Sequence, residues 1–191
     1  MTVTDELAIL VFEIIIFQYN YVLLLINMVN QNLQTTPKTF LRTISIIHLV
    51  LNLGLILFAA VTFFINSGRN VFNYNTNDPF VMVAPLLAIA GIAGGIFLFK
   101  KQVAIAQSKD TLKGKLALYQ GALIQKYALV EGPAMFAIVA YDLSGNLLFL
   151  IISGLLLLYF ISIRPTKDRL VTDLDLSYED KITFDSEDTQ I

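Results

Sequence analysis

The chain has 191 residues, of which 56% are hydrophobic and 15% charged, with a formal net charge of −2, one His and no Cys. Soluble domains carry about 25% charged residues, so this composition, with a mean hydropathy of +0.69, indicates a membrane protein. The lack of Cys excludes disulfides, thiolate nucleophiles and Cys-rich metal sites. With a single His, we expect no metal and no cofactor, and the slight negative charge gives no attraction to nucleic acid.

Long apolar runs predict an all-α fold, a polytopic transmembrane bundle of five helices over residues 1–163. A helix needs about 20 mostly apolar residues to cross a bilayer core. The runs are continuous rather than alternating in polarity, which argues against a β-barrel. The five expected spans are residues 7–28, 40–65, 80–99, 116–141 and 147–163.

The first expected span is the least convincing of the five, because it contains Glu13 and other polar residues. Asp5 and Glu6 lie where a secretory signal would carry positive charge, so we do not expect a signal peptide. A natural start at Met28 is the alternative and would leave four spans. N-terminal sequencing of the native protein decides between the two.

The distribution of Lys and Arg predicts the orientation. Along the chain, connectors rich in Lys and Arg alternate with connectors that have few or none. Residues 100–115, between the third and fourth spans, carry five lysines. Since basic loops favour the cytoplasm, we expect the N-terminus outside and the C-terminus inside, in a bacterial cytoplasmic (inner) membrane.

The third and fourth spans are expected to extend beyond the membrane as a basic hairpin. Good helix formers continue through residues 100–107, and the next helix begins near Thr111. The turn is expected near Ser108, Lys109 and Asp110. The lysines of this hairpin are expected to lie at lipid headgroups, and a docking surface for a soluble partner is the alternative.

Residues 164–191 are expected to form a disordered, acidic cytoplasmic tail. They contain eight acidic and four basic residues, and such a segment cannot bury enough apolar surface to fold alone. A short amphipathic or extended docking element is the alternative. The apolar residues that would support it are Leu170, Leu174, Leu176, Ile182 and Phe184.

Glu131 is the main candidate for binding a proton or ion. It lies near the middle of the fourth span, where an ionisable residue costs about 2.5–3.5 kcal/mol and usually has a function. Burial disfavours the charged form of a carboxyl, so Glu131 is expected to be neutral unless paired and able to exchange a proton. Pro133, two residues later, cannot donate to the carbonyl of Leu129 and is expected to kink the helix.

His48 and Asn52 are further candidates for a proton or ion site. They are four residues apart in the second span and therefore share a helix face. A structural role, with hydrogen bonds to a neighbouring helix, is the alternative.

Small residues predict where helices pack closely. Gly91 and Gly95 form a GxxxG pair in the third span, and Gly121 and Gly132 each follow an Ala at the same spacing in the fourth. Such spacing lets backbones approach each other in lipid, within one chain or between protomers. Pro133 lies beside the last of these glycines.

Residues 81–140 partly resemble the helical hairpin of the proteolipid c subunits of rotary ATPases. The likeness lies in a Gly/Ala-rich helix, a polar turn, and the sequence Ala128-Leu129-Val130-Glu131-Gly132-Pro133-Ala134-Met135-Phe136-Ala137-Ile138-Val139-Ala140. In that family a carboxylate within the membrane carries the translocated ion, a role that the resemblance gives to Glu131. As a whole, the chain looks more like a small bacterial multi-pass membrane protein.

Two functions follow from these features. The first is a structural or accessory membrane subunit that acts through helix contacts, with the lipid bilayer and either a second copy or another membrane protein as partners. The alternative is proton- or ion-coupled transport that uses Glu131, which would be lost in Glu131→Gln. An enzyme is not expected, because the sequence has no catalytic triad, metal-ligand spacing or phosphate-binding loop.

Overall fold

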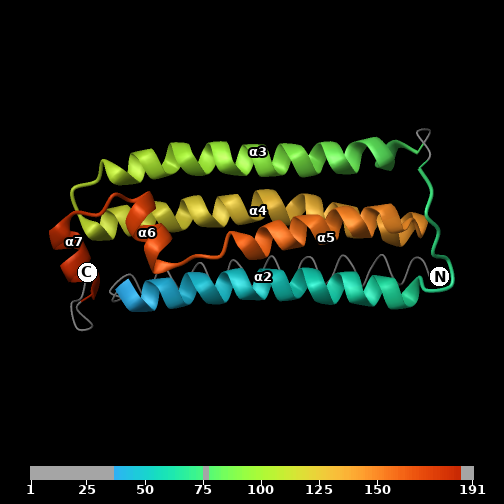
Figure 1. The fold of residues 1–191 in the computed structure, drawn as a ribbon, viewed down its shortest axis with the longest axis horizontal. Helices are drawn as coiled ribbons and strands as arrows, with labels where there is room; N and C mark the ends of the chain where they lie inside the picture. The colour runs from blue at the N-terminus through green and yellow to red at the C-terminus, as the bar shows by residue number, and fades with distance from the viewer. Residues whose placement is uncertain (1–36, 75–77, 186–191) are drawn as a thin grey trace, which may run out of the picture.

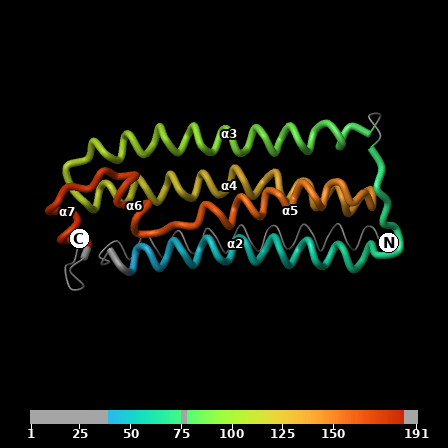
Figure 2. The backbone as a smooth tube through the Cα atoms, in the orientation of Figure 1, coloured from blue at the N-terminus to red at the C-terminus, as the bar shows by residue number. Residues whose placement is uncertain are grey.

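The structure, a computed structural model, describes residues 37–74 and 78–185. Within these residues the chain is all-α, as expected, and contains no β-strand. Figure 1 shows four long helices along one axis and two short helices at one end, and Figure 2 shows the chain reversing direction between successive long helices. The helices are α2 (Pro37–Ile65), α3 (Pro79–Gln107), α4 (Leu112–Ser144), α5 (Leu147–Ser162), α6 (Lys167–Asp173) and α7 (Tyr178–Asp185).

Helices α2 to α5 coincide with the second to fifth expected spans, whereas residues 7–28 lie outside the described residues. Helices α3 and α4 extend beyond residues 80–99 and 116–141, as expected, and meet at a turn over residues 108–111. Of the described helices, α2, α3 and α4 are each long and apolar enough to cross a membrane. A fourth crossing arises if α5 and α6, which are bent by 80°, form one broken span. These helices indicate an integral membrane protein.

The turn between α4 and α5 depends on Gly145. Its φ of 68° lies in the left-handed region that favours glycine, and a Cβ there would lie 2.5 Å from the carbonyl oxygen of Arg69. The amide of Val71 donates to the Gly145 carbonyl at 3.0 Å, and the amide of Leu147 donates to the Val71 carbonyl at 2.9 Å. The turn therefore holds the segment after α2 against the ends of α4 and α5.

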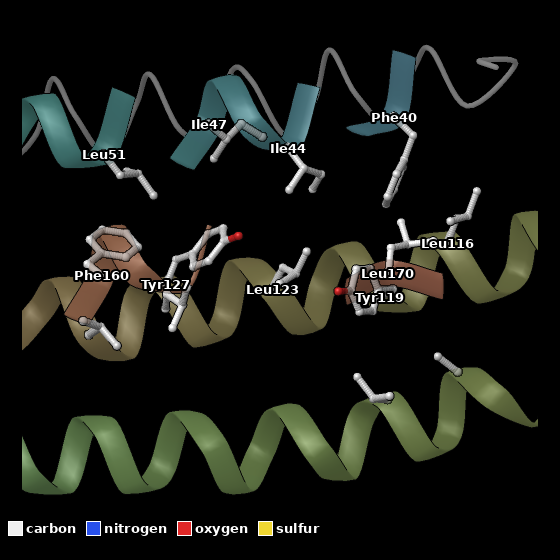
Figure 3. Close-up of a cluster of buried hydrophobic side chains, with 14 of the residues drawn as sticks. Phe40, Ile44, Ile47, Leu51, Leu116, Tyr119, Leu123, Tyr127, Phe160 and Leu170 are labelled. Carbon is white, nitrogen blue, oxygen red and sulfur yellow. The ribbon is translucent and has the colours of Figure 1, made fainter. Parts of the chain in front are cut away.

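Helix α4 is the central element and packs against α2, α3 and α5. Its buried face includes Tyr119, Tyr127 and Tyr141, each at most 2% exposed. Figure 3 shows α2 facing α4, with Phe160 of α5 and Leu170 of α6 in the same apolar cluster. The other labelled side chains of this cluster are Phe40, Ile44, Ile47, Leu51, Leu116 and Leu123.

The C-terminal segment corrects the expectation of a disordered tail. Residues 167–185 contain α6 and α7, which close the end of the bundle formed by α2, α3 and α4 (Figure 1). The segment has too little apolar surface to fold alone, but α2 and α4 supply the surface against which it packs. Residues 186–191 lie outside the described residues. The buried apolar side chains of the segment are Leu170, Leu174, Leu176 and Phe184.

Polar contacts fasten the same segment to the hairpin. Lys115 Nζ lies 2.7 Å from Asp180 Oδ2, the Tyr119 hydroxyl donates to Asp173 Oδ2 at 2.8 Å, and Gln107 Nε2 donates to the Asp173 carbonyl at 2.7 Å. Burial acts to raise the pKa of Asp180, but the hydrogen bond and charge of Lys115 and the hydrogen bonds of Ser177 together outweigh it and hold this pKa below its usual value. The contact therefore stabilises the fold above the pKa of an unfolded Asp, and this stabilisation is lost as the pH falls through the lowered value.

Candidate functional site

A cluster of buried polar side chains lies where α2, α4 and the end of α5 meet. His48 and Asn52 of α2 are 7% and 5% exposed, and Tyr127 of α4 is fully buried. We call these three side chains the polar centre. The structure thus brings together the two residues that the spacing placed on one helix face and adds a tyrosine from a second helix.

His48 binds the C-terminal end of α5. Its Nε2 atom lies 2.9 Å from the carbonyl oxygen of Phe160, and since a carbonyl only accepts, Nε2 carries the proton. The Phe160 carbonyl lies in the last turn of α5, where it also accepts from the amide of Ile163 at 3.2 Å. Carbonyls in this turn form the negative end of the helix dipole. Pro165, which has no N–H, follows this end. His48 therefore stabilises the point at which α5 stops and the chain turns toward α6.

Aromatic rings enclose the imidazole. The ring centroids of Tyr127 and Phe160 each lie 5.0 Å from that of His48, and they lie 5.5 Å from each other. These distances fall in the range of favourable tilted and edge-to-face aromatic pairs. These two rings, one from α4 and one from α5, fix the orientation of His48.

Asn52 leaves one acceptor unused at the polar centre. Its Nδ2 atom donates to the His48 carbonyl at 2.7 Å and lies 3.3 Å from His48 Nε2. The bond to the carbonyl fixes the amide orientation, because only Nδ2 can donate there. Among the described residues, neither Asn52 Oδ1 nor the Tyr127 hydroxyl has a hydrogen-bond partner. The centre thus offers one acceptor and one hydroxyl, both buried.

Glu131 lies one turn beyond Tyr127 on α4 and is half-buried. At about 100° per residue, it is turned about 40° away from Tyr127, toward the exposed side of α4 where Ala128 and Gly132 lie. Helix α4 continues through Pro133 without ending. Glu131 therefore stands at the border between the buried face of α4 and its exposed face.

The predicted packing residues fall into two groups. A Cβ at Gly91 would lie 2.3 Å from the carbonyl oxygen of Leu129 and 2.8 Å from Pro133 Cγ, so α3 and α4 touch here. A Cβ at Gly95 would lie 3.6 Å from the Lys126 carbonyl oxygen, an ordinary contact. By contrast, a Cβ at Gly121 or Gly132 would meet no atom within 4 Å. These last two glycines face away from every described helix of this chain.

Sequence reasoning missed several polar and aromatic contacts of α4. Tyr127 and Phe160 carry no signal in an apolar span, because only their contact with His48 marks them. Lys126 Nζ lies 4.4 Å from the ring centroid of Phe99 on α3, a cation–π contact. In the part of the chain that the structure describes, no group of three or more His, Asp and Glu residues lies together in a way that could hold a metal ion.

Two tyrosines of α4 are expected to respond oppositely to removal of the hydroxyl. The Tyr127 hydroxyl lacks a partner among the described residues, so Tyr127→Phe should leave the free energy of unfolding unchanged or raise it by about 1 kcal/mol. Tyr119→Phe removes the bond to Asp173 and should cost about 1.5–3 kcal/mol. Thermal unfolding in mild detergent, followed by circular dichroism, measures both. A larger loss in Tyr127→Phe would mean that its hydroxyl binds a partner.

Comparisons with known proteins do not identify a family or a function for the chain. No protein-family model matches the chain, and searches against curated proteins and solved structures found no match. The resemblance of residues 81–140 to the proteolipid hairpin therefore stays a prediction. So do the roles of Glu131, His48 and Asn52.

Proposed function

We propose that this chain is a multi-pass protein of a bacterial inner membrane, with a cytoplasmic C-terminus, that serves as a structural or accessory subunit. It acts through contacts between its helices and those of a second copy or another membrane protein. One observation carries the proposal. The exposed face of α4 presents small residues that no described helix of the chain covers.

This face, which we call the open stripe, runs along α4. Its residues are all exposed, and the two glycines have open space around them. Helices associate in lipid mainly by close packing of small residues, since lipid tails are as apolar as the side chains they would replace. Within the chain, α3 and α4 already use this kind of packing at Gly91. The open stripe consists of Ala117, Gly121, Ala128 and Gly132.

Helix α3 offers a second face of this kind. Ala90 is exposed, and a Cβ at Gly94 would meet no atom within 4 Å. Both residues lie on α3 away from the Gly91 contact with α4. With uncovered small-residue faces on two helices, the chain can contact more than one neighbour, as expected of a subunit in an assembly.

The test compares substitutions in the open stripe with a matched glycine elsewhere. Gly121→Leu and Gly132→Leu should separate the protein from its companion or second copy in mild detergent, because leucine prevents close approach. Gly154→Leu on α5 is the control, since Gly154 also has open space around it. Size-exclusion chromatography with light scattering measures the mass of the complex. A wild-type protein that purifies as a lone monomer contradicts the proposal.

Ion-coupled transport is the second candidate. The polar centre supports it, because two buried atoms of Asn52 and Tyr127 lack described partners and Glu131 follows one turn later on α4. In this function Glu131 carries the proton or ion, and His48 and Asn52 assist it. Flux driven by a pH gradient in proteoliposomes should then be lost in Glu131→Gln. Unchanged flux in that variant ends this candidate.

A further inference from the structure

Several cations lie in one zone of the bundle, about 24–35 Å along the helices from the end at which α3 and α5 begin. At about 1.5 Å per residue, Lys100 lies about 32 Å from the start of α3, and Arg42 lies about 35 Å from the far end of α2. Lys126 lies about 27 Å from the far end of α4. Arg164 follows α5, which is about 24 Å long. These distances bracket the hydrocarbon thickness of a bilayer, which is about 30 Å.

We call this set the cation belt. Four of its members are exposed, and Lys126 is half-buried with its Nζ over the ring of Phe99. In the described part of the chain, none of the five forms an ion pair with a carboxylate. The members of the belt are Arg42, Lys100, Lys101, Lys126 and Arg164.

Among the described residues, no carboxylate of the C-terminal segment forms an ion pair with a cation of the belt, although Lys126 is near enough to feel the charge of Asp173. Asp180 pairs with Lys115, and Asp173 accepts from Tyr119. Both of these partners lie on α4 nearer the hairpin turn than Lys126. Asp180 and Asp173 thus make their direct contacts beyond the belt, and the exposed cations of the belt stay open to a counter-charge from outside the chain.

We propose that the cation belt binds the phosphate groups of anionic phospholipids. The inference rests on the membrane location proposed above. The ends of α2, α3 and α4 lie beyond the belt together with α6 and α7 (Figure 1). In the arrangement proposed here, they form a helical head in water. A membrane surface fits the belt better than a soluble anion, because its cations come from four successive segments in one zone of the bundle and do not converge on one pocket. Each cation near an anionic surface strengthens binding roughly fivefold.

The experiment counts lipids that stay bound to the purified protein. Wild type, a belt variant and a distal control are extracted in mild detergent and exposed to equal amounts of phosphatidylglycerol and phosphatidylcholine. Native mass spectrometry then gives the ratio of the two lipids retained. The belt variant is Lys100→Gln with Lys101→Gln and Arg164→Gln. The control is Lys109→Gln with Lys113→Gln, two exposed lysines on either side of the hairpin turn.

Wild type and control should retain more phosphatidylglycerol than phosphatidylcholine. In the belt variant the ratio of the two lipids should fall at least tenfold, while its circular dichroism spectrum stays helical. Equal retention in all three proteins overturns the inference. The inference is also overturned if soluble glycerol phosphate displaces the lipid. It is overturned as well if the belt variant loses a bound acidic protein and not a lipid. If wild type leaves the membrane without detergent, the proposed membrane function fails too. If the wild type needs detergent for extraction but retains the two lipids equally, this inference fails and the proposed membrane function stands.

Discussion

Gly91→Ala is expected to destabilise the bundle by about 1–3 kcal/mol, a typical cost of overpacking a tight interface. The new Cβ would lie 2.3 Å from the Leu129 carbonyl oxygen, a backbone atom that cannot turn aside. Helices α3 and α4 would have to separate, and the loss should outweigh the gain of about 1 kcal/mol in helix propensity from replacing Gly by Ala. The midpoint of thermal unfolding in mild detergent measures the effect.

Gly94→Ala is the matched control for this prediction. Gly94 lies on the same helix within one turn of Gly91, but a Cβ there would meet no atom within 4 Å. Its midpoint should equal that of the wild type or rise slightly. If the two variants unfold at the same temperature, α3 does not approach α4 at Gly91 as closely as the structure shows.

Leu170→Ala is expected to release the C-terminal segment from the bundle. Leu170 is fully buried in the cluster shared by α2, α4 and α6 (Figure 3), and truncating such a leucine costs about 2–5 kcal/mol. Helices α6 and α7 are short, so this loss is a large part of what holds them. Limited proteolysis should cut the variant after residue 164 much faster than the wild type.

The control for this prediction is Ile182→Ala, because Ile182 on α7 is 53% exposed. Its rate of proteolysis should stay within about twofold of the wild type. If wild type, Leu170→Ala and Ile182→Ala are all cut at the same fast rate, residues 167–185 do not dock, and the expectation of a disordered tail applies after all.

The long helices were predictable from sequence, whereas docking of the tail was only the alternative to disorder. Hydropathy over about 20 residues depends only on the local chain, so α2, α3 and α4 were found with small errors at their ends. Residues 164–191 are acidic on average, which favoured disorder over the docking element that Leu170, Leu174, Leu176 and Phe184 form. Their burial depends on surfaces of α2 and α4 that are remote in sequence.

The candidate site shows the same division between local and remote contacts. His48 and Asn52 were paired correctly because a four-residue spacing is local. Phe160, whose carbonyl binds His48, lies 112 residues away in sequence, and no pattern links the two. The spacing of small residues also did not separate Gly91, which touches α4, from Gly132, which faces open space. Spacing shows that a helix can pack closely, and only the fold shows against what.

Depth measurement with spin labels tests the central claim, a bundle that crosses the membrane and ends in a water-exposed head. The chain has no native Cys, so single labels can be placed at Ile89 and Ile105, which are 67% and 50% exposed on α3. In proteoliposomes, oxygen should accelerate the spin relaxation of the label at residue 89, and a water-soluble nickel reagent should not. The label at 105 should show the reverse. Equal access of the nickel reagent to both labels would contradict the account.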